Sequence, residues 1–119
     1  MESYKMDFHV TVTDRADAIV VHLAGELDMA TAERALDALR GSDLRAARSL
    51  VVDLADVSFC DSSGLRLLLH LRQAMVEHGG GFDAVGAHGI VASTIDVTGL
   101  AEVLHVPAGG GPSEAKSDR

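Results

Sequence analysis

Two adjacent serines stand where an apolar, strand-like segment gives way to a leucine-rich helical one. In the stretch "VSFCDSSGLRLLLHLRQAM", residues 57–75, the change is marked by Asp61, Ser62, Ser63 and Gly64. Side-chain oxygens at such a turn accept hydrogen bonds from the free N–H groups of the first helical turn, so capping is their simplest role. One capping residue is enough, and a glycine there costs about 0.5–1 kcal/mol relative to alanine. The extra polar residues therefore indicate a second role: catalysis, metal binding, or acceptance of a modifying group.

The first two of these roles lack the residues that they need. A serine nucleophile is not supported, because the chain has no G-x-S-x-G elbow and its six histidines stand singly. Four acidic residues could bind a metal ion in the manner of a phosphate-accepting receiver: Asp28, Asp53, Asp56 and Asp61. A receiver also uses a lysine beside its acidic pocket, and the only lysines, Lys5 and Lys116, lie near the two ends of the chain. We therefore expect no catalytic residue, no metal and no cofactor, and we expect Cys60 to be a packing residue.

The third role makes a serine the substrate of another enzyme. A hydroxyl group on an exposed strand-to-helix turn is accessible to a kinase. The N-terminus of a helix also tolerates the negative charge that a phosphate adds. Capping remains the alternative, and it does not exclude phosphorylation of the same turn.

Segments with strand and helix periods surround this turn. Strands are predicted at residues 7–14, 18–27, 49–57, 82–87 and 101–106, and helices at residues 28–41, 62–78 and 89–100. The continuous β-branched run at 18–27 is typical of a strand covered on both faces. The second strand, first helix and third strand form a crossover, which makes the two strands parallel and brings the loops after them to one edge of the sheet. Asp28, the expected N-cap of the first helix, should therefore lie near Ser62.

Composition limits the class of protein. The 119 residues suit one domain, and 47% of them are apolar but only 3% aromatic, so the core must consist of Leu, Val, Ile and Ala. A formal net charge of −8 argues against direct binding to nucleic acid or to an anionic membrane surface. A single cysteine allows no internal disulfide, the N-terminus lacks a signal-peptide pattern, and no apolar run nears the roughly 18 residues of a membrane helix. These features predict a cytoplasmic protein.

The segments "LAGELDMATAERALDAL" and "SLVVDLADVSFCDSSGLRLLL" together resemble the STAS-domain anti-sigma factor antagonists, also called anti-anti-sigma factors. The resemblance covers about residues 8 to 106, with "GELD" before the first helix, "DSSGL" opening the second and "TGL" near the third. It implies an α/β fold in residues 1–107: a STAS-type mixed β-sheet of four to five strands, packed with about three to four helices. Residues 108–119 are Gly-rich and polar, which predicts a disordered tail in place of the amphipathic helix that usually closes the family's fold.

The resemblance also implies a partner switch in which the protein is not an enzyme. The unphosphorylated protein binds an anti-sigma factor that is itself an ATP-dependent serine kinase, and a sigma factor is released. The kinase phosphorylates Ser62, the complex separates, and a metal-dependent serine phosphatase resets the protein, which is expected to be a monomer or weak dimer. The partner-binding residues that the motifs and the second helix indicate are Asp28, Asp61, Ser63, Gly64, Leu65 and Leu69.

Two of these residues are expected at the surface for reasons of packing. The leucines of 62–78 cover more of the helix circumference than one core-facing stripe requires, so Leu65 and Leu69 are expected to be exposed beside the serines. Gly64 is expected where the backbone of another molecule comes close. The alternative function keeps the fold and makes the chain a STAS-type scaffold or sensor that binds a nucleotide or another regulator, with Ser62 only capping its helix.

Overall fold

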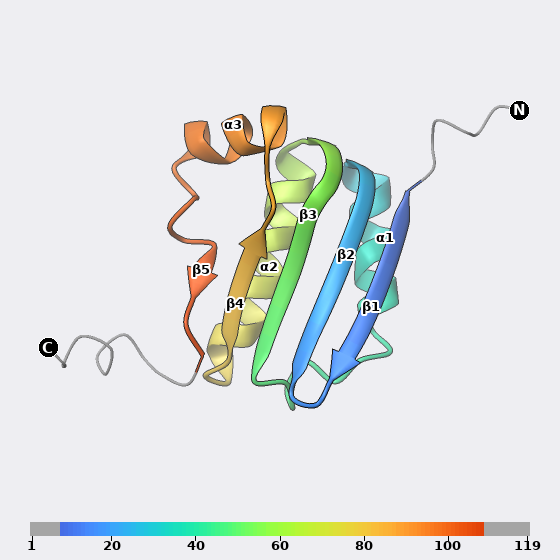
Figure 1. Cartoon of the computed structure of the whole chain (residues 1–119), viewed down its shortest axis with the longest axis vertical. Coiled ribbons are helices and arrows are strands. Elements are labelled where there is room, and N and C mark those ends of the chain that lie inside the picture. The colour runs from blue at the N-terminus through green and yellow to red at the C-terminus, as the bar shows by residue number, and fades with distance from the viewer. Residues whose placement is uncertain (1–7, 109–119) are drawn as a thin grey trace, which may run out of the picture.

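One mixed sheet of five strands carries the helices (Figure 1). The structure is a computed structural model that describes residues 8–108. The strands are β1 (His9–Arg15), β2 (Ala18–Leu27), β3 (Ser49–Cys60), β4 (Gly81–Val85) and β5 (His105–Val106), and they lie side by side in chain order. The helices are α1 (Met29–Leu39), α2 (Ser62–Glu77) and α3 (Gly89–Thr98). The described part of the chain thus confirms the predicted α/β class, with five strands and three helices.

The three central strands are parallel. β2 pairs with β3 and β3 with β4 in parallel, whereas β1 and β5 pair antiparallel at the two sides of the sheet. Helix α1 connects β2 to β3, which confirms the predicted crossover, and α2 makes a second crossover from β3 to β4. Both helices lie behind the sheet in Figure 1 and begin at the edge where the preceding parallel strand ends. Two helix starts are therefore brought to one edge of the sheet.

Strand β3 holds two more residues than β2 along their shared ladder. The pairing shifts twice, by one residue each time, before Leu27 pairs with Cys60. One shift lies at Gly25, whose φ of 113° falls in the left-handed region that favours glycine. Because each shift inserts a residue into β3, Val57 and Cys60 both point into the core while Phe59 turns to solvent.

The core lies between the sheet and the helices α1 and α2. Fully buried side chains come from alternate strand positions and from the inner sides of the helices, among them Val21, Leu23, Leu50, Val52, Leu54, Leu68, Met75 and Phe82. The prediction that residues 18–27 are covered on both faces is wrong, because Val20 and His22 are only half-buried on the open face of β2. Val20 pairs there with Val51 of β3, so these β-branched residues pack across strands and not under a second layer.

The last elements differ in how well they match their predictions. Helix α3 confirms the helix predicted at 89–100. Strand β5 is shorter than predicted, because the N–H of Leu104 donates to the carbonyl of Leu100 at 3.1 Å and holds this segment in turns. The tail predicted at 108–119 lies, apart from Ala108, outside the described residues. None of the described helices combines the length and apolar content needed to cross a membrane.

Candidate functional site

The ends of β2 and β3 bring the two predicted loops together. Leu27 and Cys60 are paired in the parallel ladder, and the N–H of Asp61 donates to the carbonyl of Leu27 at 3.2 Å. Asp28 and Asp61 follow directly on the two strands, and each is the N-cap of the next helix. The structure thus confirms that the segment containing Asp28 lies beside the one containing Ser62 (Figure 1).

At the start of α1 the capping groups of Asp28 and Thr31 are bonded within the chain. The carboxylate of Asp28 accepts a hydrogen bond from the N–H of Thr31 at 3.0 Å, and Thr31 Oγ1 accepts one from the N–H of Asp28 at 2.8 Å. The same hydroxyl donates to the carbonyl of Glu26 at 2.7 Å and is buried. The hydrogen bond from the N–H of Thr31 also lowers the pKa of Asp28 below its ordinary value. This end of α1 is a closed structural cap.

At the start of α2 the cap leaves one hydroxyl group free. The carboxylate of Asp61 accepts hydrogen bonds from the N–H of Ser63 at 2.8 Å and of Gly64 at 3.2 Å. Ser62, the first residue of the helix, is exposed, and within residues 8–108 its hydroxyl makes no hydrogen bond. Ser63 is half-buried and therefore lies deeper than Ser62. Asp61 therefore caps α2, and the hydroxyl of Ser62 is not needed for capping.

The glycine at this turn is explained by the chain's own packing. A Cβ added to Gly64 would lie 2.6 Å from the Sγ of Cys60 and 2.9 Å from both the Cγ and the carbonyl oxygen of Leu27. The expectation that another molecule's backbone approaches Gly64 is therefore wrong, because the end of β2 already occupies that space. Gly64 lets α2 begin directly against the two strand ends.

The expectation that Leu65 is exposed is also wrong, since only 7% of it is accessible. Leu65 is the fourth residue of α2, and the fourth residue of α1, Ala32, is buried in the same way. Seven residues further along α2, Arg72 Nε donates to the carbonyl of Val103 in the segment between α3 and β5 at 2.9 Å. Leu69 is half-buried and packs against the core. The two leucines do not form the expected apolar strip.

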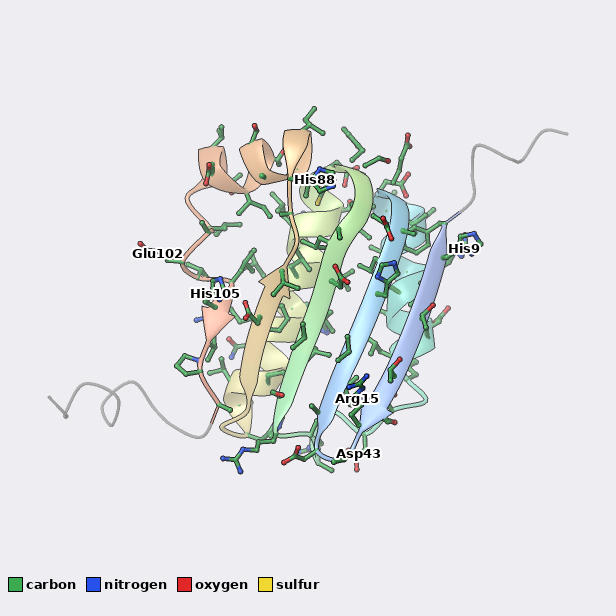
Figure 2. All side chains as sticks on the ribbon, in the orientation of Figure 1. His9, Arg15, Asp43, His88, Glu102 and His105 are labelled. Carbon is green, nitrogen blue, oxygen red and sulfur yellow. The ribbon has the colours of Figure 1, made fainter. Side chains whose placement is uncertain are left out.

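Three other side chains form an apolar rim at the same edge of the sheet. Met29 is the first residue of α1, Phe59 lies near the end of β3, and Ile90 is the second residue of α3; they are 70%, 40% and 57% exposed. The start of α3 is held at this edge because His88 Nε2 donates to the carbonyl of Ala55 at 2.8 Å (Figure 2). Periodicity did not reveal this rim, although an apolar residue directly after an N-cap, such as Met29, is a usable signal because that position faces solvent.

A hollow of about 220 Å³ opens between α1 and α2 beside the serines. Its lining combines apolar residues, among them Leu36 and Leu67, with the polar Ser63, Arg66 and Glu33. The same edge of the sheet therefore offers a free hydroxyl, exposed apolar side chains and a lined hollow. Such a mixture of apolar and polar surface is typical of interfaces that form reversibly.

The surroundings of Cys60 do not make its thiol reactive. Burial, together with the charge of Asp61, raises the pKa of the Cys60 thiol to about 11, so the thiol stays protonated near neutral pH. This agrees with its expected role in packing. Within the described range, His, Cys, Asp and Glu side chains form no group of three or more that could hold a metal ion.

The fold and this edge place the chain in a known class. The profile of the STAS domain family matches residues 8–109, and the chain therefore belongs to the STAS domain family. It is 27% identical over 104 residues to the anti-sigma-B factor antagonist of Staphylococcus epidermidis, which covers 87% of this chain and 96% of that protein.

Solved structures of similar proteins lead to the same class. An anti-sigma factor antagonist from Mycobacterium paratuberculosis shares 27% identity and superimposes with a TM-score of 0.72, over 99% of this chain and 97% of the other. The phosphorylated form of the Bacillus cell fate determinant SpoIIAA superimposes with a TM-score of 0.60 over 94% of this chain and 98% of its own. At 19% identity this last likeness shows the fold alone.

Proposed function

We propose that the protein is an anti-sigma factor antagonist whose unphosphorylated form binds an anti-sigma factor and thereby releases a sigma factor. The anti-sigma factor is an ATP-dependent serine kinase that transfers the γ-phosphoryl group of ATP to Ser62 Oγ, leaving ADP. A metal-dependent serine phosphatase removes the phosphate. The protein supplies the acceptor hydroxyl and the docking surface, works in the cytoplasm and is no enzyme itself. The names of its Staphylococcus and Mycobacterium relatives support this role.

The observation that carries the proposal is the free hydroxyl group of Ser62. It is exposed on the first residue of α2, while Asp61 alone caps the helix. A kinase can therefore reach the oxygen without breaking a hydrogen bond of the fold. Ser63 is half-buried and its N–H is engaged by Asp61, so it is the poorer acceptor. That SpoIIAA, a protein of the same fold, occurs in a phosphorylated form is consistent with this regulation.

Phosphorylation is expected to act on binding and not on folding. The phosphate adds about −1.5 to −2 charge at pH 7. At a helix N-terminus such a charge is favoured by roughly 0.3–1 kcal/mol, whereas repulsion from Asp61 and Asp28 opposes it and is screened by solvent and salt. In an interface the same charge, desolvated and unpaired, costs several kcal/mol, and each 1.4 kcal/mol is about tenfold in affinity. The partner surface is thus switched off while the helix persists.

Calorimetric titration with a candidate anti-sigma kinase tests the proposal. The unmodified protein should bind, and protein phosphorylated on Ser62 should bind at least about two orders of magnitude more weakly. Ser62→Ala should bind as the unmodified protein does, before and after treatment with ATP. If both forms bind equally, or if neither binds any anti-sigma factor, the proposal is wrong. The second outcome would favour the alternative of a STAS scaffold or sensor that binds another regulator.

A further inference from the structure

Arg66 lies one helical turn after Ser62 on the exposed side of α2. Residues four apart in a helix are neighbours, with Cβ atoms about 5–6 Å apart. Helical side chains also lean toward the N-terminus, so the long side chain of Arg66 is able to extend toward the turn that holds Ser62. A guanidinium group at this distance can reach a phosphate on the serine oxygen.

The guanidinium of Arg66 is available for this contact. Several other arginines are already engaged: Arg34 donates to the carbonyl of Phe8, Arg40 pairs with Asp37, and Arg72 donates to the carbonyl of Val103. In the part of the chain that the structure describes, Arg66 forms no ion pair and no side-chain hydrogen bond. Glu33 lines the same hollow without pairing with it.

The carboxylate of Asp61, the residue before Ser62, does not pair with Arg66 either. One carboxylate oxygen of Asp61 accepts the N–H groups of Ser63 and Gly64 and is held in the cap. The carboxylate of Asp28 is held in the same way at the start of α1. In a chain with a formal net charge of −8, Arg66 is thus an uncommitted cation within one turn of the acceptor serine.

We propose that Arg66 holds the phosphate on Ser62 by charge-assisted hydrogen bonds from its guanidinium group to the phosphate oxygens. The inference rests on the proposed function, because it concerns the modified state of the same serine. It gives phosphorylation two effects on the partner surface. A negative charge appears at the edge, and Arg66 is withdrawn from the hollow between α1 and α2 that it lines in the unmodified protein. Both effects oppose rebinding of a partner that docks on the unmodified edge.

Phosphorus NMR of protein that carries phosphoserine at position 62, introduced genetically without a kinase, tests the inference. The second ionisation of phosphoserine has a pKa of about 6, and pairing with a cation lowers it. We expect the pKa of the phosphate in the Arg66→Gln variant to be about 0.3 unit higher than in the otherwise unchanged protein, and Arg66→Lys to recover part of the difference. Added salt should reduce the difference.

Arg45→Gln is the matched control. Arg45 is exposed in the connection from α1 to β3, two residues after Asp43. Asp43 lies at the end of the molecule opposite to the start of α2 (Figures 1 and 2). The Arg45→Gln substitution removes the same charge from the chain and should leave the pKa of the phosphate unchanged. The other ionisable side chains on the elements around this edge include Glu26, Asp28, Glu33, Asp56, Asp61, His70 and His88. The ring signals of both histidines, followed in the same titration, separate their ionisation from that of the phosphate.

Two outcomes would overturn the contact between Arg66 and the phosphate, and both can be told apart from failure of the proposed function. Equal phosphate pKa values with and without the Arg66 guanidinium would overturn the inference, even if a kinase modifies Ser62. An equal change in Arg45→Gln would show a general charge effect and would overturn it too. If no kinase modifies Ser62 but the expected difference is seen, the proposed function fails and the contact stands. Circular dichroism of each variant checks that it is folded, and Arg66→Ala repeats the test should Arg66→Gln not fold.

Discussion

The starts of α1 and α2 are built alike but use their hydroxyl groups differently. Each helix follows one of the paired strand ends and has an aspartate as its N-cap. In α1 the hydroxyl belongs to the third residue, Thr31, where it is buried and bonded to the backbone of Glu26 and Asp28. In α2 the third residue is Gly64, and a hydroxyl stands instead on the first residue, Ser62, where it is exposed.

The comparison shows that position within the first helical turn decides what a polar group can do. The first residues of the two helices, Met29 and Ser62, both face solvent. The third and fourth residues face inward in both helices. A hydroxyl at the third position is therefore fixed by the fold, whereas one at the first position remains exposed to solvent. The same edge thus holds a cap with a bonded hydroxyl next to a cap with a free one.

The largest effect on stability is expected where α2 meets the strand ends. Gly64→Ala forces a Cβ to within 3 Å of Cys60 and of the backbone of Leu27. Relief of that overlap moves the helix start and should lower the free energy of unfolding by roughly 1–3 kcal/mol. Gly41→Ala is the control, because the nearest atom to its added Cβ is the carbonyl oxygen of Ala38 at 3.9 Å. Urea denaturation of both variants checks this, and equal stabilities would show that α2 does not depend on the contact.

The next largest contrast in stability is expected between removal of the Thr31 hydroxyl and removal of the Ser62 hydroxyl. Thr31→Val keeps the shape of the side chain but leaves the carbonyl of Glu26 and the N–H of Asp28 without their partner, which should cost about 1–3 kcal/mol. Ser62→Ala removes an exposed, unbonded hydroxyl and should change stability by no more than about 0.5 kcal/mol. Thermal melts of the pair measure the contrast. A large loss in Ser62→Ala would mean that Ser62 has a structural role after all.

A smaller effect concerns the charge at the α1 cap. The pKa of Asp28 is lowered in the folded protein, so its charge stabilises the fold above the ordinary pKa of aspartate and the contribution is lost as pH falls through the folded value. Asp28→Asn retains a capping oxygen without the charge. Its stability deficit should be about 0.3–1 kcal/mol at pH 7 and should shrink below about pH 4. A deficit that stays constant between pH 7 and pH 3 would contradict this assignment.

The smallest effect on stability is expected from phosphorylation itself. Because the helix dipole favours the phosphate while Asp61 and Asp28 repel it, the two terms nearly cancel at the exposed first position of α2. The phosphorylated protein should keep its helical circular dichroism and unfold within a few degrees of the unmodified protein. Loss of the signal of one helix would show instead that the switch works by melting α2.

Local patterns in the sequence were enough to predict the class, the first cap at Asp28 and the turn that holds the second cap. The strand and helix periods, together with the order of the elements, predicted the parallel crossover and hence that Asp28 and Ser62 lie at one edge. These features depend on residues close in sequence, and the structure confirms them.

The partner surface was harder to predict because it depends on contacts between distant segments. The burial of Leu65 depends on how α2 packs into the core, which its own helical period does not specify. The exposure of Phe59 depends on two shifts in the pairing of β2 and β3 that no short pattern reveals. The role of Gly64 depends on the position of Leu27, which is 37 residues earlier in the chain.

The most direct test of the contrast between the two helix starts is the intact mass of the protein after incubation with its anti-sigma kinase and ATP. The unmodified sequence should gain one phosphate, Ser63→Ala should gain one as well, and Ser62→Ala should gain none. Binding of Ser62→Ala to the kinase, measured in the same preparation, shows that the variant still docks. Stoichiometric phosphate on Ser62→Ala would contradict the claim that the free hydroxyl at the start of α2 is the one that the kinase modifies.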